Sequence, residues 1–211
     1  MKRNIGKQAF FFDGLARKGV MAGFDGREGT KARGLVHRMG LRPGDAVFEP
    51  GCGSGRFTVL LADAVSPRGR VFSCDVSGGM LRIARKRGLP ARVRFKRASA
   101  DRTGTAAGSF DVVVCFNAFP HFQPPGPYLR EWARILAPRG RLFVAHTMSR
   151  RTLNRFHRNA GHTVSRHTLP PQRVMRSLLK KAGFGLRSVR DGGGTYLLAA
   201  QRLSHGHVVG K

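Results

Sequence analysis

Three glycines at every second position follow a short apolar run in the first third of the chain. Residues 47–55 read VFEPGCGSG, so that the glycines are Gly51, Gly53 and Gly55. Glycine adopts backbone conformations that a side chain forbids, and an apolar strand ending in such a loop lets the backbone approach a ligand closely. The pattern predicts a strand followed by a nucleotide-cofactor turn.

An acidic residue ends the next apolar run. Asp75 follows residues 71–74, and an acid at a neighbouring strand end can accept hydrogen bonds from both hydroxyls of a ribose. A dinucleotide motif, G-x-G-x-x-G, would need glycine where this chain has Arg56, which argues against a nicotinamide cofactor. Glu49, two residues before the first glycine, suits instead a ligand with a cationic amino acid portion.

Four segments resemble the motifs of the class I S-adenosylmethionine-dependent methyltransferases. They are residues 49–55, 75–81, 100–101 and 110–117. The resemblance implies an α/β fold with a doubly wound, mostly parallel seven-stranded sheet and a C-terminal antiparallel hairpin, and S-adenosylmethionine as cofactor. The residues that it implies for binding this cofactor are Glu49, Gly51, Gly53, Ser54, Gly55, Asp75, Val76, Met80, Asp101 and Asn117.

Apolar spacing along the middle of the chain alternates between strand and helix periods. It predicts a helix after Gly55, and a second helix that Ser77 caps and that ends at Gly88. Strict alternation over residues 92–96 predicts an edge strand, whereas the apolar residues 112–114 predict a central one.

The later part of the chain continues the alternation. A helical stripe that includes Leu136 is expected to stop at residues 138–140, before a strand at 142–145. A helix over residues 174–182, ended by Gly183, is expected before two hairpin strands joined by three glycines.

Length and pattern predict one domain spanning residues 1–211. Its N-terminal segment is similar to the opening helix of the small-molecule branch that includes the ubiquinone and menaquinone biosynthesis methyltransferases. The expected parts are an N-terminal helical cap (1–40), a cofactor-binding core (41–146), a basic His-rich lid (147–169), a C-terminal helix and hairpin (170–202) and a mobile tail (203–211).

The composition constrains location and partners. No apolar stretch approaches the length of a membrane span, and no signal peptide is evident, so a cytoplasmic protein with reduced cysteines is expected. The net charge of +28 predicts nonspecific attraction to nucleic acid. Because the basic residues are spread along the whole chain, charge alone does not indicate a nucleic acid substrate.

Two histidines follow the predicted fourth and fifth strands, at the sheet edge where ligands bind. His121 and His146 could each act as a general base near neutral pH, or each could only hydrogen-bond its neighbours. The loop after Asn117 lacks the adjacent prolines of enzymes that methylate base amino groups, which counts against that reaction.

The segment between residues 146 and 170 combines histidines with arginines. Its basic groups could hold an anionic acceptor, or form a solvated lid. His157, His162 and His167 are five residues apart, a spacing that disfavours a metal site on a single helix. No metal is therefore expected.

The sequence thus predicts methyl transfer from S-adenosylmethionine to a small-molecule acceptor. Three alternatives remain open: an RNA or protein methyltransferase that uses the basic surface, a nicotinamide oxidoreductase, and a non-catalytic regulator that binds the cofactor. The acceptor, the atom that is methylated and the oligomeric state are not indicated by the sequence.

Overall fold

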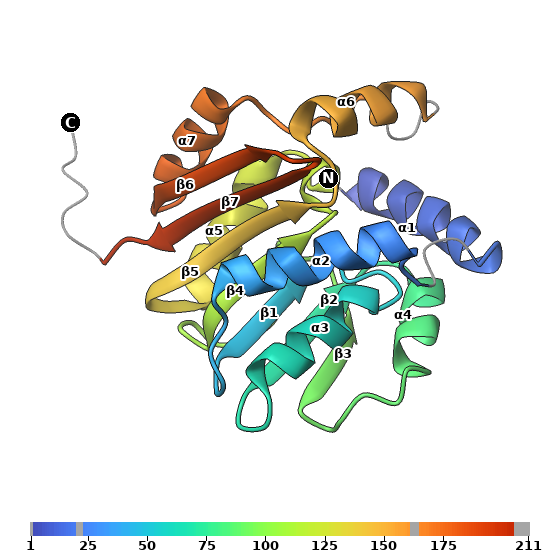
Figure 1. The fold of residues 1–211 in the computed structure, drawn as a ribbon, viewed down its shortest axis with the longest axis horizontal. Helices are drawn as coiled ribbons and strands as arrows, with labels where there is room; N and C mark the ends of the chain where they lie inside the picture. The colour runs from blue at the N-terminus through green and yellow to red at the C-terminus, as the bar shows by residue number, and fades with distance from the viewer. Residues whose placement is uncertain (1, 20–22, 161–164, 205–211) are drawn as a thin grey trace.

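A computed structural model of the chain describes residues 2–19, 23–160 and 165–204. Strands and helices alternate from β1 to β3 (Figure 1). The strands are β1 (Ala46–Pro50), β2 (Arg70–Asp75), β3 (Val93–Arg97), β4 (Phe110–Phe116), β5 (Leu136–His146), β6 (Phe184–Gly192) and β7 (Thr195–Arg202). The α-helices are α1 (Lys2–Arg17), α2 (Gly26–Met39), α3 (Arg56–Val65), α4 (Gly78–Arg85), α5 (Pro125–Ile135), α6 (Arg150–Asn159) and α7 (Gln172–Lys181).

The strands form one seven-stranded sheet in the order β3-β2-β1-β4-β5-β7-β6. The five strands from β3 to β5 are parallel, whereas β7 pairs antiparallel with both β5 and β6. The predicted doubly wound fold with a C-terminal hairpin is therefore confirmed. The chain crosses from one half of the sheet to the other between β1 and β4, and in such folds ligands bind at the carboxyl ends of the strands beside this point.

Alternate residues of the central strands point to opposite faces of the sheet, where they belong to two apolar layers. Val112 and Val114 of β4 pack with α2 and α3, through residues such as Leu35 and Leu61. Val113 belongs to the other layer, which includes side chains of α5 and α7. Figure 1 shows α2 and α3 on one face of the sheet and α5 and α7 on the other. Because both faces are covered, residues 112–114 of the central strand β4 are apolar and buried, as the sequence predicted.

Several features of the elements agree with the local sequence patterns. Ser77 caps α4 by accepting a hydrogen bond from the backbone N–H of Met80. The edge position of β3 agrees with its alternating pattern. Gly193 and Gly194 have φ angles of 59° and 70° between the paired Gly192 and Thr195, which makes a two-residue hairpin turn of glycines.

Two predicted boundaries were wrong. The helix α4 ends at Arg85 instead of Gly88, because its last backbone bonds close at Lys86 and the side chain of the next residue, Arg87, donates to the carbonyl of Ser54. Leu136 begins β5 instead of ending α5, because it pairs with Phe110 in the sheet. The expected stop at residues 138–140 lies inside β5, between the paired Leu136 and Arg141.

The expected N-terminal cap contains α1 and α2, and the expected lid contains α6. His162 of the lid and residues 205–211 of the expected tail lie outside the described residues. No helix in the described ranges combines the length and the apolar character needed to cross a membrane.

Candidate functional site

A cavity of about 860 Å³, open at its mouth, lies at the carboxyl edge of the sheet. The ends of β1, β2 and β4 contribute to its wall, and α1 closes part of it. Its lining includes Gln8, Phe12, Glu49, Gly51, Cys52, Gly53, Ser54, Arg56, Cys74, Asp75, Val76, Met80, Ser99, Ala100, Phe116, Asn117, Ala118, His121, Phe122 and Tyr128.

The glycine turn after β1 needs glycine for different reasons at its three positions. Gly51, Gly53 and Gly55 all have positive φ angles, of 69°, 55° and 73°. A Cβ on Gly51 would lie 3.0 Å from that of Ala118, and one on Gly55 would lie 3.0 Å from that of Ala84. A Cβ on Gly53 would meet no atom within 4 Å, so its conformation, together with the cavity that it lines, accounts for the glycine there.

Asp75 connects the glycine turn to the start of α4. Its two carboxylate oxygens accept backbone N–H bonds from Gly53 and Ser77, each 2.8 Å long. Burial raises the pKa of Asp75, and these two hydrogen bonds oppose the effect. The carboxyl group thus sits at the end of β2 and lines the cavity, as expected for a group that meets a ribose.

Glu49 lies deeper. Its side chain is buried and accepts hydrogen bonds from the hydroxyls of Thr58 (2.6 Å) and Ser73 (2.8 Å). Burial raises the pKa of Glu49 to about 7, and the nearby charge of Asp75 acts in the same direction. Because the carboxyl group is poised between its two charge states, a cation in the cavity would favour the ionised form.

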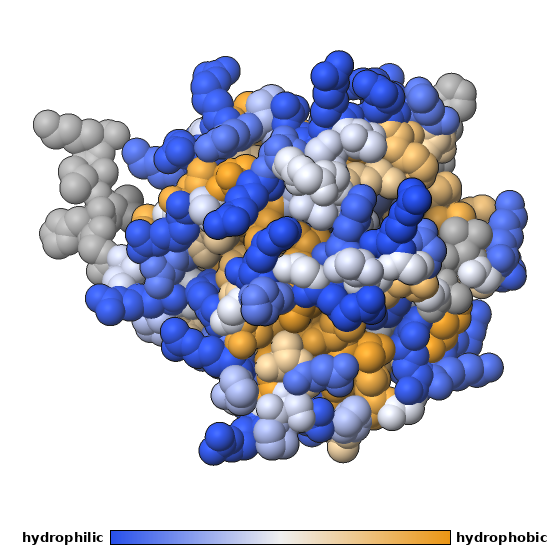
Figure 2. All heavy atoms as spheres, in the orientation of Figure 1, coloured by the Kyte–Doolittle hydropathy of each residue, from blue (hydrophilic) through white to orange (hydrophobic). Residues whose placement is uncertain are grey.

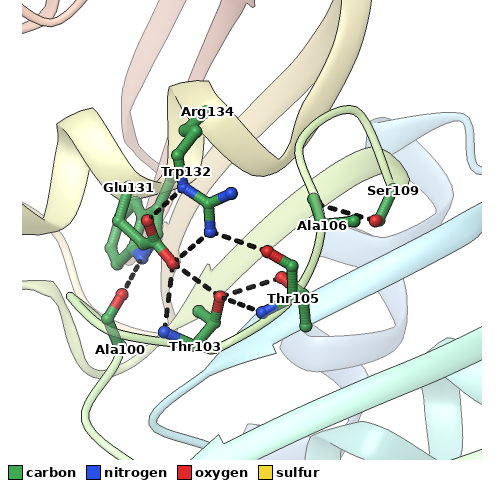
Figure 3. A network of polar contacts seen from close by, with 8 residues as sticks. All are labelled: Ala100, Thr103, Thr105, Ala106, Ser109, Glu131, Trp132 and Arg134. Atoms are coloured by element: carbon green, nitrogen blue, oxygen red, sulfur yellow. Dashed lines mark hydrogen bonds and ion pairs between the residues drawn. The ribbon is translucent and has the colours of Figure 1, made fainter.

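The structure places Gly55 and Asp101 beside the cavity instead of in its wall. Asp101 accepts a hydrogen bond from the hydroxyl of Ser99, which does line the cavity. The loop around Asp101 is held against α5: the indole N–H of Trp132 donates to the carbonyl of Ala100 (3.0 Å). In Figure 3, Glu131 of α5 joins the same loop to Arg134, and the contacts include Thr103 and Thr105.

The sequence analysis missed a polar network between α2 and the strand ends. Glu28 forms a bidentate ion pair with Arg56, at 2.7 and 2.9 Å. The same carboxylate accepts a hydrogen bond from the hydroxyl of Thr147, and Asn117 donates to it at 3.4 Å. Asn117 itself has a φ of 49° after β4. These residues are far apart in the chain, so no local pattern could have indicated the network.

The helix α1 also reaches the site. Gln8 donates to the carbonyl of His121 at 2.6 Å, and Phe12 packs edge-on against the His121 ring. Asp13 accepts hydrogen bonds from Ser77 and from the backbone N–H of Gly79, at the N-terminus of α4. The helix is therefore fastened to both ends of the cavity.

Three histidines, His121, His157 and His167, gather beside the cavity. Nδ1 of His121 lies 3.0 Å from Nδ1 of His167, so one ring donates and the other accepts. Nδ1 of His157 meets the carbonyl of His167. Burial, followed by the neighbouring histidines, lowers the pKa of His121 to about 3. His121 is therefore neutral near pH 7 and lines the cavity.

His146 is placed differently. It is fully buried at the end of β5, packs against Tyr196 and is not part of the cavity wall. Within the described ranges, neither of its ring nitrogens has a hydrogen-bond partner. Burial, helped by His157, lowers its pKa to about 3. No group of three or more histidine, cysteine or acidic side chains in the described part of the chain has an arrangement suited to a metal ion.

Comparison with known proteins shows similarity to methyltransferases. The family model described as a methyltransferase domain matches residues 48–144. The ubiquinone/menaquinone biosynthesis C-methyltransferase UbiE of Ectopseudomonas mendocina is 32% identical over 116 residues, which cover 53% of this chain and 45% of that protein. The chain therefore matches less than half the length of this relative.

Two solved structures share the fold. The complex of the Haloferax volcanii Trm112 methyltransferase activator with a methyltransferase matches with a TM-score of 0.74 and 22% identity, over 92% of this chain and 98% of the matched chain. A S-adenosylmethionine-dependent methyltransferase from Aquifex aeolicus matches with a TM-score of 0.67 and 20% identity, over 82% and 89%. These likenesses extend the agreement in fold to most of the chain.

Proposed function

We propose that the protein transfers a methyl group from S-adenosylmethionine to a small-molecule acceptor, a proposal supported by the match of residues 48–144 to a methyltransferase domain. The observation that carries the proposal is Asp75. Its half-buried carboxylate stands at the end of β2, accepts a hydrogen bond from the backbone N–H of Gly53 and lines the cavity. A carboxylate in this position suits the paired hydroxyls of an adenosyl ribose.

The residues present fit this cofactor at several points. The open position at Gly53 admits a ligand close to the backbone. Glu49 supplies a carboxyl group whose ionised form a cationic amino acid portion would favour. Ser54, Val76, Met80 and Asn117 line the same cavity, whereas Gly55 supports the turn and Asp101 orders the loop beside Ser99.

When bound, S-adenosylmethionine supplies a methyl group on a positively charged sulfur, so that the leaving group becomes neutral. The chain's own contribution is to position the acceptor, exclude water and take up a proton where the acceptor carries one. The aromatic rings of Phe12, Phe122 and Tyr128 provide apolar walls.

His121 is the better placed of the two predicted bases. It is neutral near pH 7 and faces the cavity, and its contact with His167 orients the ring. The contact between the two Nδ1 atoms gives a proton taken up by His121 a route to His167, although burial lowers the pKa of His167 as well. The role of His146 stays a prediction, and its place outside the wall favours a supporting role.

A small molecule is the favoured acceptor for two reasons. The ubiquinone and menaquinone methyltransferases among the relatives are named for small-molecule products. The cavity wall also includes the aromatic rings of Phe12, Phe122 and Tyr128. The expected lid at 147–169 lies beside the site through His157 and His167, which contact His121 of the cavity wall.

The proposed substrate class is tested with S-adenosylmethionine that carries a labelled methyl group. The protein is incubated separately with a small-molecule extract, total RNA and total protein, and label is counted in each fraction at physiological salt. We expect label in the small-molecule extract only. Label in RNA or protein would favour the basic-surface alternative, and bound cofactor without any transfer would favour a regulator.

A further inference from the structure

The helix α1 lines the cavity through Phe12, and α6 contacts His121 of the cavity wall through His157. Each of the two helices presents an exposed aromatic ring. Phe10 of α1 is 74% exposed and Phe156 of α6 is 55% exposed. Large apolar side chains avoid water unless something covers them or they stand alone on the surface. Here both rings lie on elements that meet at the same site.

The inner faces of the two helices converge on one residue. Phe12 of α1 lies 5.4 Å from the ring of His121, and His157 of α6 lies 5.1 Å from it, measured between ring centroids. His121 lines the cavity. Phe10 and Phe156 are exposed on the same two helices, whose Phe12 and His157 contact His121.

The charge around these rings has one sign. Lys7 and Arg17 on α1 are exposed, and α6 adds exposed Arg151, Arg155 and Arg158. The sequence of α6 contains no acid, and the single acid of α1, Asp13, is engaged by Ser77 and Gly79. Figure 2 shows apolar surface set among hydrophilic surface at the end of the molecule where α1 and α6 lie.

The buried and the exposed side chains of α6 lie on different faces of the helix. Leu153 and His157 are buried against the protein, whereas the arginines and Phe156 face outward. Cationic side chains beside aromatic ones on the outer faces of helices are the features of a helix that lies at a bilayer surface. The arginines attract anionic headgroups, while the aromatic rings enter the boundary below them.

We propose that the outer faces of α1 and α6 bind the surface of an anionic lipid bilayer, with Phe10 and Phe156 inserted. This membrane-facing surface would place the mouth of the cavity at the level of the headgroups. RNA is less well suited, because single strands bind where aromatic rings line a groove, and these two rings stand on the convex outer sides of helices. The inference does not depend on the proposed methyl transfer, since binding is measured without cofactor or acceptor.

The test is sedimentation of the full chain with vesicles of phosphatidylcholine alone or with added phosphatidylglycerol, at physiological salt. We expect binding only to the anionic vesicles. Removal of one inserted ring, Phe10→Ala or Phe156→Ala, should lower the partition coefficient about fivefold, and the double variant about 25-fold. The matched control is Val174→Ala with Leu203→Ala, which removes exposed apolar side chains of α7 and of the chain after β7 and should change nothing.

A second pair of variants tests the charge. Arg155→Glu with Arg158→Glu should abolish sedimentation with the anionic vesicles, because it reverses the sign of the outer face of α6. Absence of wild-type binding, or binding that the double phenylalanine variant leaves unchanged, would overturn the proposal. A labelled single-stranded RNA is titrated in parallel: weaker RNA binding by that variant, without vesicle binding by the wild type, would assign the surface to RNA instead.

Discussion

The glycine turn after β1 (Gly51–Gly55) and the loop after β4 that carries His121 lie at one edge of the sheet. Different kinds of hydrogen bond fix the conformations of the two segments. Backbone groups hold the turn: its N–H groups bond to the carbonyl of Cys74 and to the carboxylate of Asp75. Side chains from distant segments hold the histidine loop, among them Gln8 and His167. A constant ligand needs a fixed backbone, whereas an acceptor site can vary by exchanging side chains.

The comparison predicts that the turn tolerates no side chain at its first glycine. We expect Gly51→Ala to lower the free energy of unfolding by about 4 kcal/mol, because it adds both a disfavoured φ and a close contact with Ala118. Gly88→Ala is the control: Gly88 has a similar φ of 64° but open space around it, and should cost about 1 kcal/mol. Equal losses in urea unfolding would show that packing at the turn is unimportant.

The buried Glu49, which lines the proposed cofactor site, should lower the free energy of unfolding of the ligand-free protein at high pH. The pKa of Glu49 is about 7 in the folded chain against 4.5 in the unfolded one, so stability is lost as the pH rises from 4.5 through 7. At pH 8, Glu49→Gln should therefore raise the free energy of unfolding by about 3 kcal/mol, with no gain at pH 4. A variant that is less stable than the wild type at pH 8 would contradict this reading.

The buried His146 should make the free energy of unfolding depend on pH with the opposite sign. Burial lowers the pKa of His146 from 6.5 to about 3, so the folded state loses stability as the pH falls below 6.5. At pH 5 the loss from this residue should be about 2 kcal/mol, and His146→Phe should remove it. The exposed His37 gives the control variant, His37→Phe, which should keep the wild-type slope between pH 7 and 5.

The hydrogen-bond network around Glu28 should contribute the least of these groups to the free energy of unfolding. Glu28→Gln removes the charge that Arg56 pairs with at the edge of the cavity, and we expect a loss of about 1 kcal/mol. Asp191→Asn breaks a longer ion pair, 3.7 Å from Arg150, and should change stability very little. If thermal unfolding shows the same loss in both variants, the Glu28 network has no special role.

The same contrast explains what could be predicted from the sequence. The glycine turn, Asp75, the Ser77 cap and the hairpin depend on residues close together in the chain, and motifs report such features directly. Glu28 and Thr147, 119 residues apart, meet only after folding, so no spacing pattern indicates them. Leu136 matched the helical stripe before it, but its pairing with Phe110 placed it in β5, because tertiary pairing outweighs local periodicity.

The central claim is that the glycine turn and Asp75 together hold an adenosyl group. Calorimetric titration of S-adenosylhomocysteine into the wild type, Asp75→Ala and the exposed-site control Asp63→Ala tests it directly, with NAD as the second ligand. We predict that S-adenosylhomocysteine binds and NAD does not, and that Asp75→Ala alone weakens binding by about 1.5 to 3 kcal/mol. Equal affinity in all three proteins, or preferential binding of NAD, would contradict the account.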